Sequence, residues 1–169
     1  MATDQITAIE DAIIERLKRL PLQAGVLPYP DKDFEKYEPM HGNGEILVSY
    51  VGEDEGAATG LDLLVQEREI QFELTFVFSS LRAVGRNGGL YAHLEAARLA
   101  LTGWRAPDCH KKTILVSVDR VRRYKQRWWQ YVQAWQFTAL NIEIPDEEQY
   151  PLLKRITAHD NLGNTTEVP

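Results

Sequence analysis

Apolar residues recur at steps of three and four positions through residues 4–20, which is the period of a helix packed on one side. Thr3 or Asp4 can accept hydrogen bonds from the free N–H groups at its start, and Pro21 ends it. The apolar positions are Ile6, Ile9, Ile13, Leu17 and Leu20. The first predicted element is therefore an amphipathic helix.

Residues 21–44 contain four prolines and several glycines, so we predict a long irregular segment there. Residues 45–51 are mostly apolar and predict a strand. The Gly- and acid-rich stretch 52–60 (GEDEGAATG) then predicts a mobile turn. Residues 61–65 are either a short strand or part of the same excursion.

The alternation of apolar and polar residues is clearest over 68–79, which predicts a strand with one buried face. A slip of one residue would turn five large apolar groups into water, so the pairing register is firmly set. These five groups are Ile70, Phe72, Leu74, Phe76 and Phe78.

A second helix is predicted over residues 90–102, after a loop at 79–89. Asn87 or Gly88 can start it, and Gly103 can end it. His93 faces away from the apolar stripe and is expected on the surface. The stripe consists of Leu90, Leu94, Ala97 and Leu101.

Residues 113–122 and 128–144 both read as strands, and the run RRYKQR at 122–127 predicts the bend of a long hairpin between them. The second strand carries apolar residues at both parities, which indicates burial on both faces. One face would pack on the core, and the other on a helix or a neighbouring subunit.

The order helix-strand-strand-helix-strand-strand predicts an α+β fold, an antiparallel sheet with two helices packed on one face. We expect a single domain over residues 1–156. Residues 157–169 are polar and without pattern, and predict a flexible C-terminal tail.

Composition places this 169-residue chain among ordinary soluble domains, with 44% hydrophobic and 26% charged residues. No apolar stretch is long enough to span a bilayer. The first twenty residues lack the basic region of a signal peptide, and Cys109 is the only cysteine, so synthesis in the cytoplasm without an intrachain disulfide is expected.

The net charge of −6 is unevenly distributed. Residues 1–85 hold 7 Lys and Arg against 16 Asp and Glu, whereas residues 86–169 hold 12 against 9. An acidic chain is a poor general nucleic-acid binder. The asymmetry can favour head-to-tail association of copies, or it can reflect two solvated faces of one domain.

Motifs of catalysis are missing from the sequence, which has no phosphate-binding loop, nucleophile elbow or zinc-protease motif. The Gly-rich residues 85–89 precede a helix and favour a connector over an anion site. The neighbours Cys109 and His110 lie in a polar loop, where adjacent side chains rarely face each other. We therefore expect no enzyme activity, no catalytic residues, no cofactor and no metal.

One basic run, at residues 120–128, alternates with aromatic residues. Such a run can bind phosphates or stack bases, dock an acidic protein surface, or keep an exposed hairpin soluble. We take it as a candidate subunit or tube interface, together with two arginines from the preceding loop. The candidate residues are Arg120, Arg122, Arg123, Lys125, Arg127, Trp128, Arg82 and Arg86.

The acidic run Glu53, Asp54 and Glu55 is a second candidate surface. A solvated charge run is a better interpretation of it than a cation site. In an assembly around DNA, the same run could line a lumen that repels the nucleic acid.

The sequence resembles a family of small tail proteins of Mu-like phages and prophages over residues 5–145. The resemblance rests on ITAIEDAIIERLK at 6–18, on ALTGW closing the second helix, on Pro107, and on Trp129 and Tyr131 followed by Phe137 and Thr138. The element order is similar to the tail-terminator fold of lambda-like phages. Residues 146–149 and the tail after 157 have no counterpart in the family and no assigned role.

The resemblance implies a structural virion protein that forms a homo-oligomeric ring, expected to be a hexamer. The ring would cap the tube at the head-proximal end of a tail, contractile or not, and join it to the neck. The implied partners are other copies of the chain, the tail tube protein and neck or connector proteins, with sheath as a further candidate. DNA would pass through without sequence-specific binding, and no membrane is involved. The alternatives are another neck, tail-completion or baseplate component, or a nucleic-acid-binding module.

Overall fold

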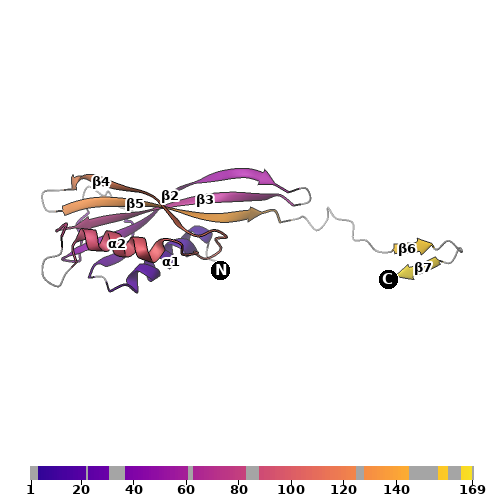
Figure 1. Cartoon of the computed structure of the whole chain (residues 1–169), viewed down its shortest axis with the longest axis horizontal. Coiled ribbons are helices and arrows are strands. Elements are labelled where there is room, and N and C mark those ends of the chain that lie inside the picture. The colour runs from indigo at the N-terminus through magenta and orange to yellow at the C-terminus, as the bar shows by residue number, and fades with distance from the viewer. Residues whose placement is uncertain are drawn as a thin grey trace.

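The computed structural model describes residues 4–21, 23–30, 37–60, 63–82, 88–124, 128–144, 156–159 and 165–168. Two helices and five strands form the main body, and two short strands lie near the C-terminus (Figure 1). The elements are α1 (Gln5–Lys18), β1 (Gly25–Pro28), β2 (Gly44–Thr59), β3 (Val65–Phe78), α2 (Leu90–Leu101), β4 (Ile114–Tyr124), β5 (Trp128–Ile142), β6 (Ile156–His159) and β7 (Thr165–Val168).

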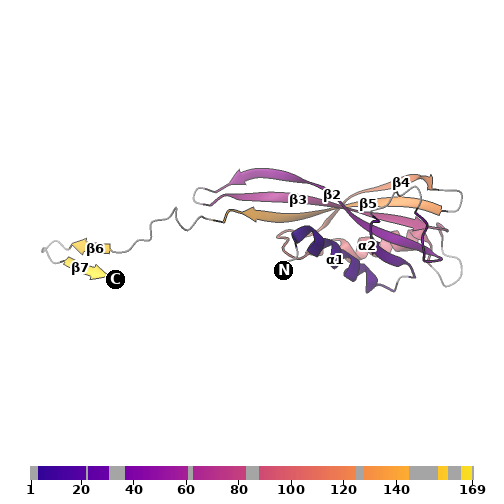
Figure 2. The same cartoon turned by 180° about the vertical axis from the view of Figure 1, so that it is seen from behind.

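The five-stranded sheet has the order β1-β2-β3-β5-β4, and both helices cover the same face of it (Figures 1 and 2). All neighbours are antiparallel except β1 and β2, which pair in parallel. The predicted α+β fold with two helices on one face is confirmed. The short strand β1 was not predicted, because its four residues, GVLP, include a proline and carry no alternation that predicts a strand.

The prediction of a mobile turn at residues 52–60 is wrong for most of that stretch. Residues 52–59 continue β2 and pair with β3 down to the pair Thr59 and Val65. Two register shifts, between Tyr50 and Gly52 and between Glu55 and Ala58, interrupt the ladder. Gly52 and Gly56, which suggested a turn, lie at these two β-bulges.

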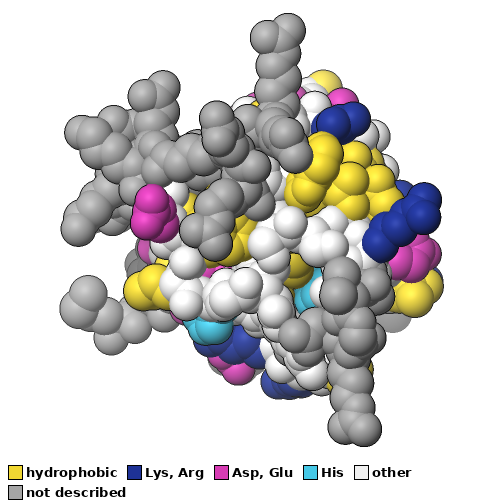
Figure 3. Space-filling model, turned by 90° about the vertical axis from the view of Figure 1, so that its left-hand side faces the viewer, with side chains coloured by type: hydrophobic (Ala, Val, Ile, Leu, Met, Phe, Trp, Pro, Cys, Tyr) yellow, Lys and Arg dark blue, Asp and Glu magenta, His cyan; other side chains and the backbone are white. Residues whose placement is uncertain are grey.

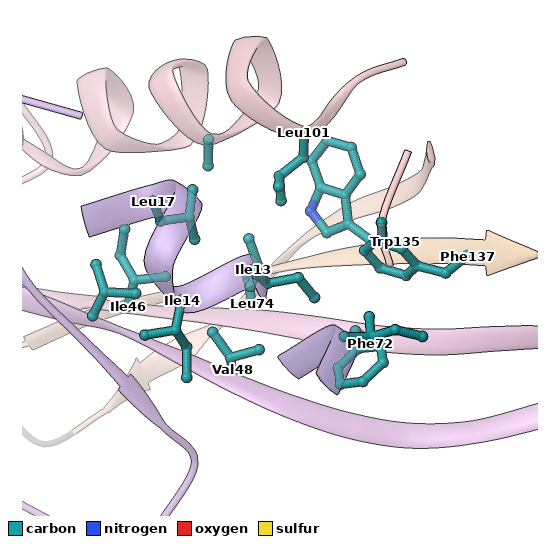
Figure 4. Close-up of a cluster of buried hydrophobic side chains, with 14 of the residues drawn as sticks. Ile13, Ile14, Leu17, Ile46, Val48, Phe72, Leu74, Leu101, Trp135 and Phe137 are labelled. Carbon is teal, nitrogen blue, oxygen red and sulfur yellow. The ribbon is translucent and has the colours of Figure 1, made fainter. Parts of the chain in front are cut away.

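The core lies between the helices and the covered face of the sheet (Figure 4). All five alternating residues of β3 predicted to be buried are at most 1% exposed. Ile9, Ile13 and Leu17 of α1 are fully buried against them, so the predicted stripe and register are confirmed.

Both helix ends follow from local chemistry. Asp4 caps α1 by accepting a hydrogen bond from the Thr7 N–H at 2.9 Å, as predicted. Helix α2 starts from Gly89, just after the predicted start at Asn87 or Gly88. Gly103 follows its last turn with a φ of 72°, a left-handed conformation that glycine adopts without a Cβ clash.

His93 is buried, which overturns the prediction that it lies on the surface of α2. Its side chain is 2% exposed, and its Nδ1 lies 2.8 Å from the carbonyl oxygen of Gly89. Its ring is tilted by 43° against that of Phe78, with the ring centroids 4.5 Å apart. The buried face of α2 therefore includes His93 as well as the aliphatic residues. Because the imidazole forms a hydrogen bond with the backbone at the start of the same helix, it can also face the sheet.

Burial lowers the pKa of His93, and the hydrogen bond with Gly89 only partly opposes this effect. A histidine whose pKa is lower in the folded than in the unfolded state contributes its full stability above the unfolded pKa. This contribution is lost as the pH falls below the unfolded pKa towards the folded one. We expect wild-type stability to decline below about pH 6.5. The His93→Phe variant should show a smaller decline there, measured by urea unfolding between pH 8 and 5; equal slopes for the two proteins would contradict this.

Strand β5 is fully buried only on its helix-facing side. Trp135, Phe137 and Ala139 are fully buried there, whereas Val132 and Ala134 on the other side are half-buried. In the part of the chain that the structure describes, both helices pack on the same side of the sheet, so a helix does not cover the second face. Cover by a neighbouring subunit remains a prediction.

Two short strands, β6 and β7, pair antiparallel within the segment where a flexible tail is predicted from residue 157. They form a sheet of their own. Polar residues such as those of TTEV gave no alternating pattern, so the sequence did not reveal these strands. The proposed domain boundary at residue 156 remains a prediction. Among the described residues, no helix has the length and apolarity needed to cross a membrane.

Candidate functional site

The long strands give the sheet two chemically different ends. At one end, here called the hairpin end, Phe78 of β3 pairs with Trp129 of β5, close to the turn between β4 and β5. At the other, called the distal end, Val65 pairs with Ile142 next to the turn between β2 and β3. The distal halves of β2 and β3 project beyond the helices (Figure 1).

The predicted basic surface belongs to the hairpin end. Arg120 is exposed on β4, Arg122 and Arg123 are residues of the same strand, and Trp128 opens β5 in register with Tyr124. Arg82 is exposed four residues after β3 ends. Lys125, Arg127 and Arg86 lie outside the described residues, so their part of the predicted surface is untested.

Aromatic rings accompany these cations. The guanidinium of Arg120 lies 5.2 Å from the centre of the Trp129 ring, a cation–π arrangement. Tyr91 of α2 meets Tyr131 edge-on, with ring centres 6.3 Å apart. Viewed from this end, hydrophobic side chains gather in a patch with Lys and Arg beside it (Figure 3).

The predicted acidic run lies on the projecting part of β2 at the distal end. Glu53 accepts a hydrogen bond from Arg68 Nη2 at 2.6 Å, and Glu55 lies 3.7 Å from Arg68 Nε. Asp54 instead points to the opposite face, where it accepts from Gln71 at 3.1 Å. The three carboxylates therefore do not converge, and two of them are already paired with an arginine.

The sheet face opposite the helices, here called the open face, is polar and acidic along β3. Glu69 and Glu73 share this face with Gln71, because alternate strand residues point the same way. Glu67, on the same face, binds His110 Nε2 at 3.0 Å and the Lys111 ammonium at 2.8 Å. The hydrogen bonds from Lys111 and then His110 lower the pKa of Glu67. The open face is thus rich in partly exposed carboxylates along residues 67–73, whereas Thr75 and Val77 further along β3 on the same face are buried.

Two strand edges carry no partner among the described strands. Strand β4 pairs with β5 only, and β1 covers β2 only as far as Val48. Apolar side chains are exposed along both edges, which is unusual for a strand that stays unpaired. They are Ile114, Val116, Val118 and Val121 on β4, at 38–57% exposure, and Tyr50 and Val51 on β2, at 39% and 52%.

A buried carboxylate holds the segment that leads into β2. Glu45 is 0% exposed and accepts hydrogen bonds from the Tyr37 hydroxyl and from the N–H groups of Met40 and His41 at 2.9 and 3.1 Å. His41 Nδ1 lies 2.7 Å from it. Burial acts to raise the pKa of Glu45, but these hydrogen bonds outweigh it and the pKa is lowered. Sequence analysis missed this role, although a lone Glu beside the apolar run of β2 was a usable signal.

Cys109 and His110 do not form a nucleophile and base. His110 forms a hydrogen bond with Glu67, whereas the side chain of Cys109 is buried and its backbone forms an isolated β-bridge with Ala139 of β5. Burial, with a smaller effect of Asp108, raises the pKa of the Cys109 thiol to about 11. We expect native protein to react with iodoacetamide at pH 8 far more slowly than unfolded protein. Equal rates in the two states, measured by mass spectrometry, would contradict the buried thiol.

Among the described residues, no group of three or more His, Cys, Asp or Glu side chains is arranged to hold a metal ion. The described residues instead form an α+β domain with two free strand edges and a sheet whose ends differ in charge.

Comparison with known proteins supports this class. The model of the Gp37 protein family matches residues 13–160, so the chain belongs to the Gp37 family. Among solved structures, a chain from the virion of a native gene transfer agent particle shares the fold, with a TM-score of 0.51 and 13% identity. The match covers 83% of this chain and 100% of that chain. No curated protein matches the chain.

Proposed function

We propose that this protein is a structural virion component, a tail terminator that forms a ring on the tail tube and joins it to the neck. The observation that carries the proposal is the fold shared with a chain of a gene transfer agent virion, which is matched over its whole length. The exposed apolar strand edges support it, because they suit a protein that completes its sheet in an assembly. The role requires no catalysis, cofactor or metal.

In the proposed ring, the helices lie outside and the open face of the sheet faces the lumen. Asp54, Glu69 and Glu73 would then repel the phosphates of passing DNA and let it slide without binding. Glu53 and Glu55 contribute less to the lumen in this arrangement, because they point to the helix side and pair with Arg68. This arrangement refines the expectation that all three residues of the acidic run line the lumen.

The lumen is tested by reversing charge on the open face. The Glu69→Lys/Glu73→Lys variant should still form rings, while DNA delivery by particles that carry it falls at least tenfold. Neutralising Asp54 alone should have a smaller effect, because it removes only one of the three carboxylates assigned to the lumen. Unchanged delivery by particles with the Lys variant would remove the lumen assignment.

The basic hairpin end is proposed to contact a neighbouring protomer or the tube protein. Its cations and aromatic rings suit an acidic protein surface, such as the distal end of the next copy. The Arg122→Glu/Arg123→Glu variant should weaken assembly by at least tenfold in protein concentration. A matched control with the same charge change, Arg98→Glu/Arg105→Glu, alters exposed residues on α2 and the loop after it. Equal assembly of the two variants would remove the proposed contact.

The terminator role itself is tested by tube growth. Purified tube protein is polymerised with and without this chain, and tube lengths are measured by electron microscopy. A terminator should shorten the tubes and appear as a single cap at one end of each. Unchanged lengths with no cap would favour another neck, tail-completion or baseplate role.

A nucleic-acid-binding module is the second candidate, favoured by the arginine stacked on Trp129. It predicts that the isolated protein is retained on DNA at low salt and released steeply as salt rises. The terminator role predicts no such retention, since the chain carries a net charge of −6.

A further inference from the structure

We infer that the partner of the free β4 edge is the free part of β2 in a second copy of this chain, so that the sheet continues from one protomer to the next. The inference rests on the proposed ring and specifies how its copies are joined. It starts from the two unpaired edges at opposite sides of the same sheet.

Strand direction permits this pairing. Strand β4 is antiparallel to β5, β5 to β3, and β3 to β2, so β4 and β2 run in opposite directions. Copies that repeat around a ring keep one orientation, and β4 of one copy therefore meets β2 of the next as an antiparallel pair. The junction would be of the same kind as the other antiparallel pairs of the sheet.

The two edges are also displaced along the strands. The free part of β2, from Gly52 to Thr59, lies opposite the first half of β3, at Gln71 to Val65. The regular part of β4 lies beside the stretch of β5 that faces the second half of β3. A sheet closes on itself only when its strands tilt and each pairing is staggered. The displacement provides that stagger.

Charge selects one register. Strand β4 contains Arg120, Arg122 and one acidic residue, Asp119, whereas β2 contains Glu53, Asp54 and Glu55 without a base in its free part. Arg120 and Glu55 lie on the helix side of the sheet, because their partners on the neighbouring strands, Tyr131 and Arg68, lie on that side.

Placing Arg120 opposite Glu55 leaves Asp119 opposite Gly56 rather than another carboxylate. Shifting β2 by two residues, so that Arg120 faces Glu53, would bring Asp119 against Asp54, a repulsive pair.

The β-bulges limit the length of the pairing. Between its bulges, β4 is regular over residues 117–121, and β2 is regular over residues 52–55. In the proposed register these two regular runs overlap where Arg120 and Val121 lie opposite Glu55 and Asp54. A short run of this kind joins copies in one register without offering a long edge to unrelated strands. The apolar residues exposed beside these runs become covered when the edges meet.

A cysteine pair tests the register. In the proposed pairing Val121 of one copy lies opposite Asp54 of the next, both on the open face. The full-length Asp54→Cys/Val121→Cys variant should form a ladder of disulfide-linked oligomers on mild oxidation, alone or on the tube. The control Leu99→Cys/Val121→Cys uses a position on α2 that is 75% exposed and should give no ladder beyond dimers. Cys109 is buried and takes no part.

A charged edge gives an independent readout. Lysine at an edge strand opposes pairing, so Val116→Lys should lower the ring population at least tenfold, whereas Leu99→Lys should leave it unchanged. Rings that persist in Val116→Lys, without a ladder from the cysteine pair, would overturn the edge pairing and leave the ring itself intact. Wild-type protein that forms no ring, alone or on the tube, would instead contradict the proposed function.

Discussion

The Trp135→Ala variant should lose about 3–5 kcal/mol of unfolding free energy, the largest effect expected from any single core substitution in this chain. Trp135 is fully buried, lies opposite Phe72 of β3 and Leu115 of β4, and faces Leu101 of α2 (Figure 4). Truncation removes contacts to both layers at once. The loss is a large fraction of the 5–15 kcal/mol typical of a domain, so urea unfolding by circular dichroism will resolve it.

The matched control is Trp135→Phe. The indole Nε1 is buried without a hydrogen-bond partner among the described residues, so phenylalanine keeps most of the packing and removes an unsatisfied N–H. We expect a cost under about 1.5 kcal/mol for this variant. A Trp135→Ala protein as stable as Trp135→Phe would mean that the two layers are not packed as described.

The Glu45→Ala variant should lose about 3 kcal/mol, because it leaves the hydroxyl and N–H donors around Glu45 without their acceptor. The effect depends on pH. A carboxyl group with a lowered folded pKa stabilises the fold above its unfolded pKa, and this stability is lost as the pH falls through the folded pKa. The difference between wild type and variant should therefore be full at pH 7 and shrink below about pH 4.5.

The control for Glu45→Ala is Glu69→Ala, which truncates a half-buried carboxylate on the open face. We expect a change within about 0.5 kcal/mol for it, as for other surface positions. A difference between wild type and Glu45→Ala that stays constant from pH 7 to pH 3 would show that the carboxylate charge is not what holds residues 37–41.

Much of the fold could be predicted because periodicity reports burial directly. The five alternating apolar residues of β3 and the stripe of α1 fixed one face of each element, and the structure buries both faces as expected. The hairpin of β4 and β5 followed from the same signal. Strand β1 escaped prediction because its four residues are held by pairing with β2, which local sequence does not reveal.

The errors have a common physical cause. Residues 52–59 contain Gly52 and Gly56, which favour a turn, yet pairing with β3 overrides this local propensity and confines the irregularity to bulges. His93 likewise was expected on the surface because it lies off the apolar stripe of Leu90 and Leu94. Its bond to Gly89 and its contact with Phe78 make burial acceptable, and both contacts depend on tertiary structure.

The candidate surfaces could be predicted in part. Sequence charge located a basic hairpin and an acidic run, and the structure places them at opposite ends of one sheet. The sequence could not show that Asp54 points to the opposite face of the sheet from Glu53 and Glu55. The face of each residue depends on the position of the bulge in β2. The free edges, which carry the further inference, become visible only when strand order is known.

The most direct test of the ring is the mass of the purified full-length protein across a concentration series, alone and with the tube protein, by light scattering. The proposed ring predicts a closed species near six times the mass of the 19.3 kDa chain, either free or appearing only on the tube. A chain that stays monomeric at high concentration and ignores the tube protein would contradict the terminator role.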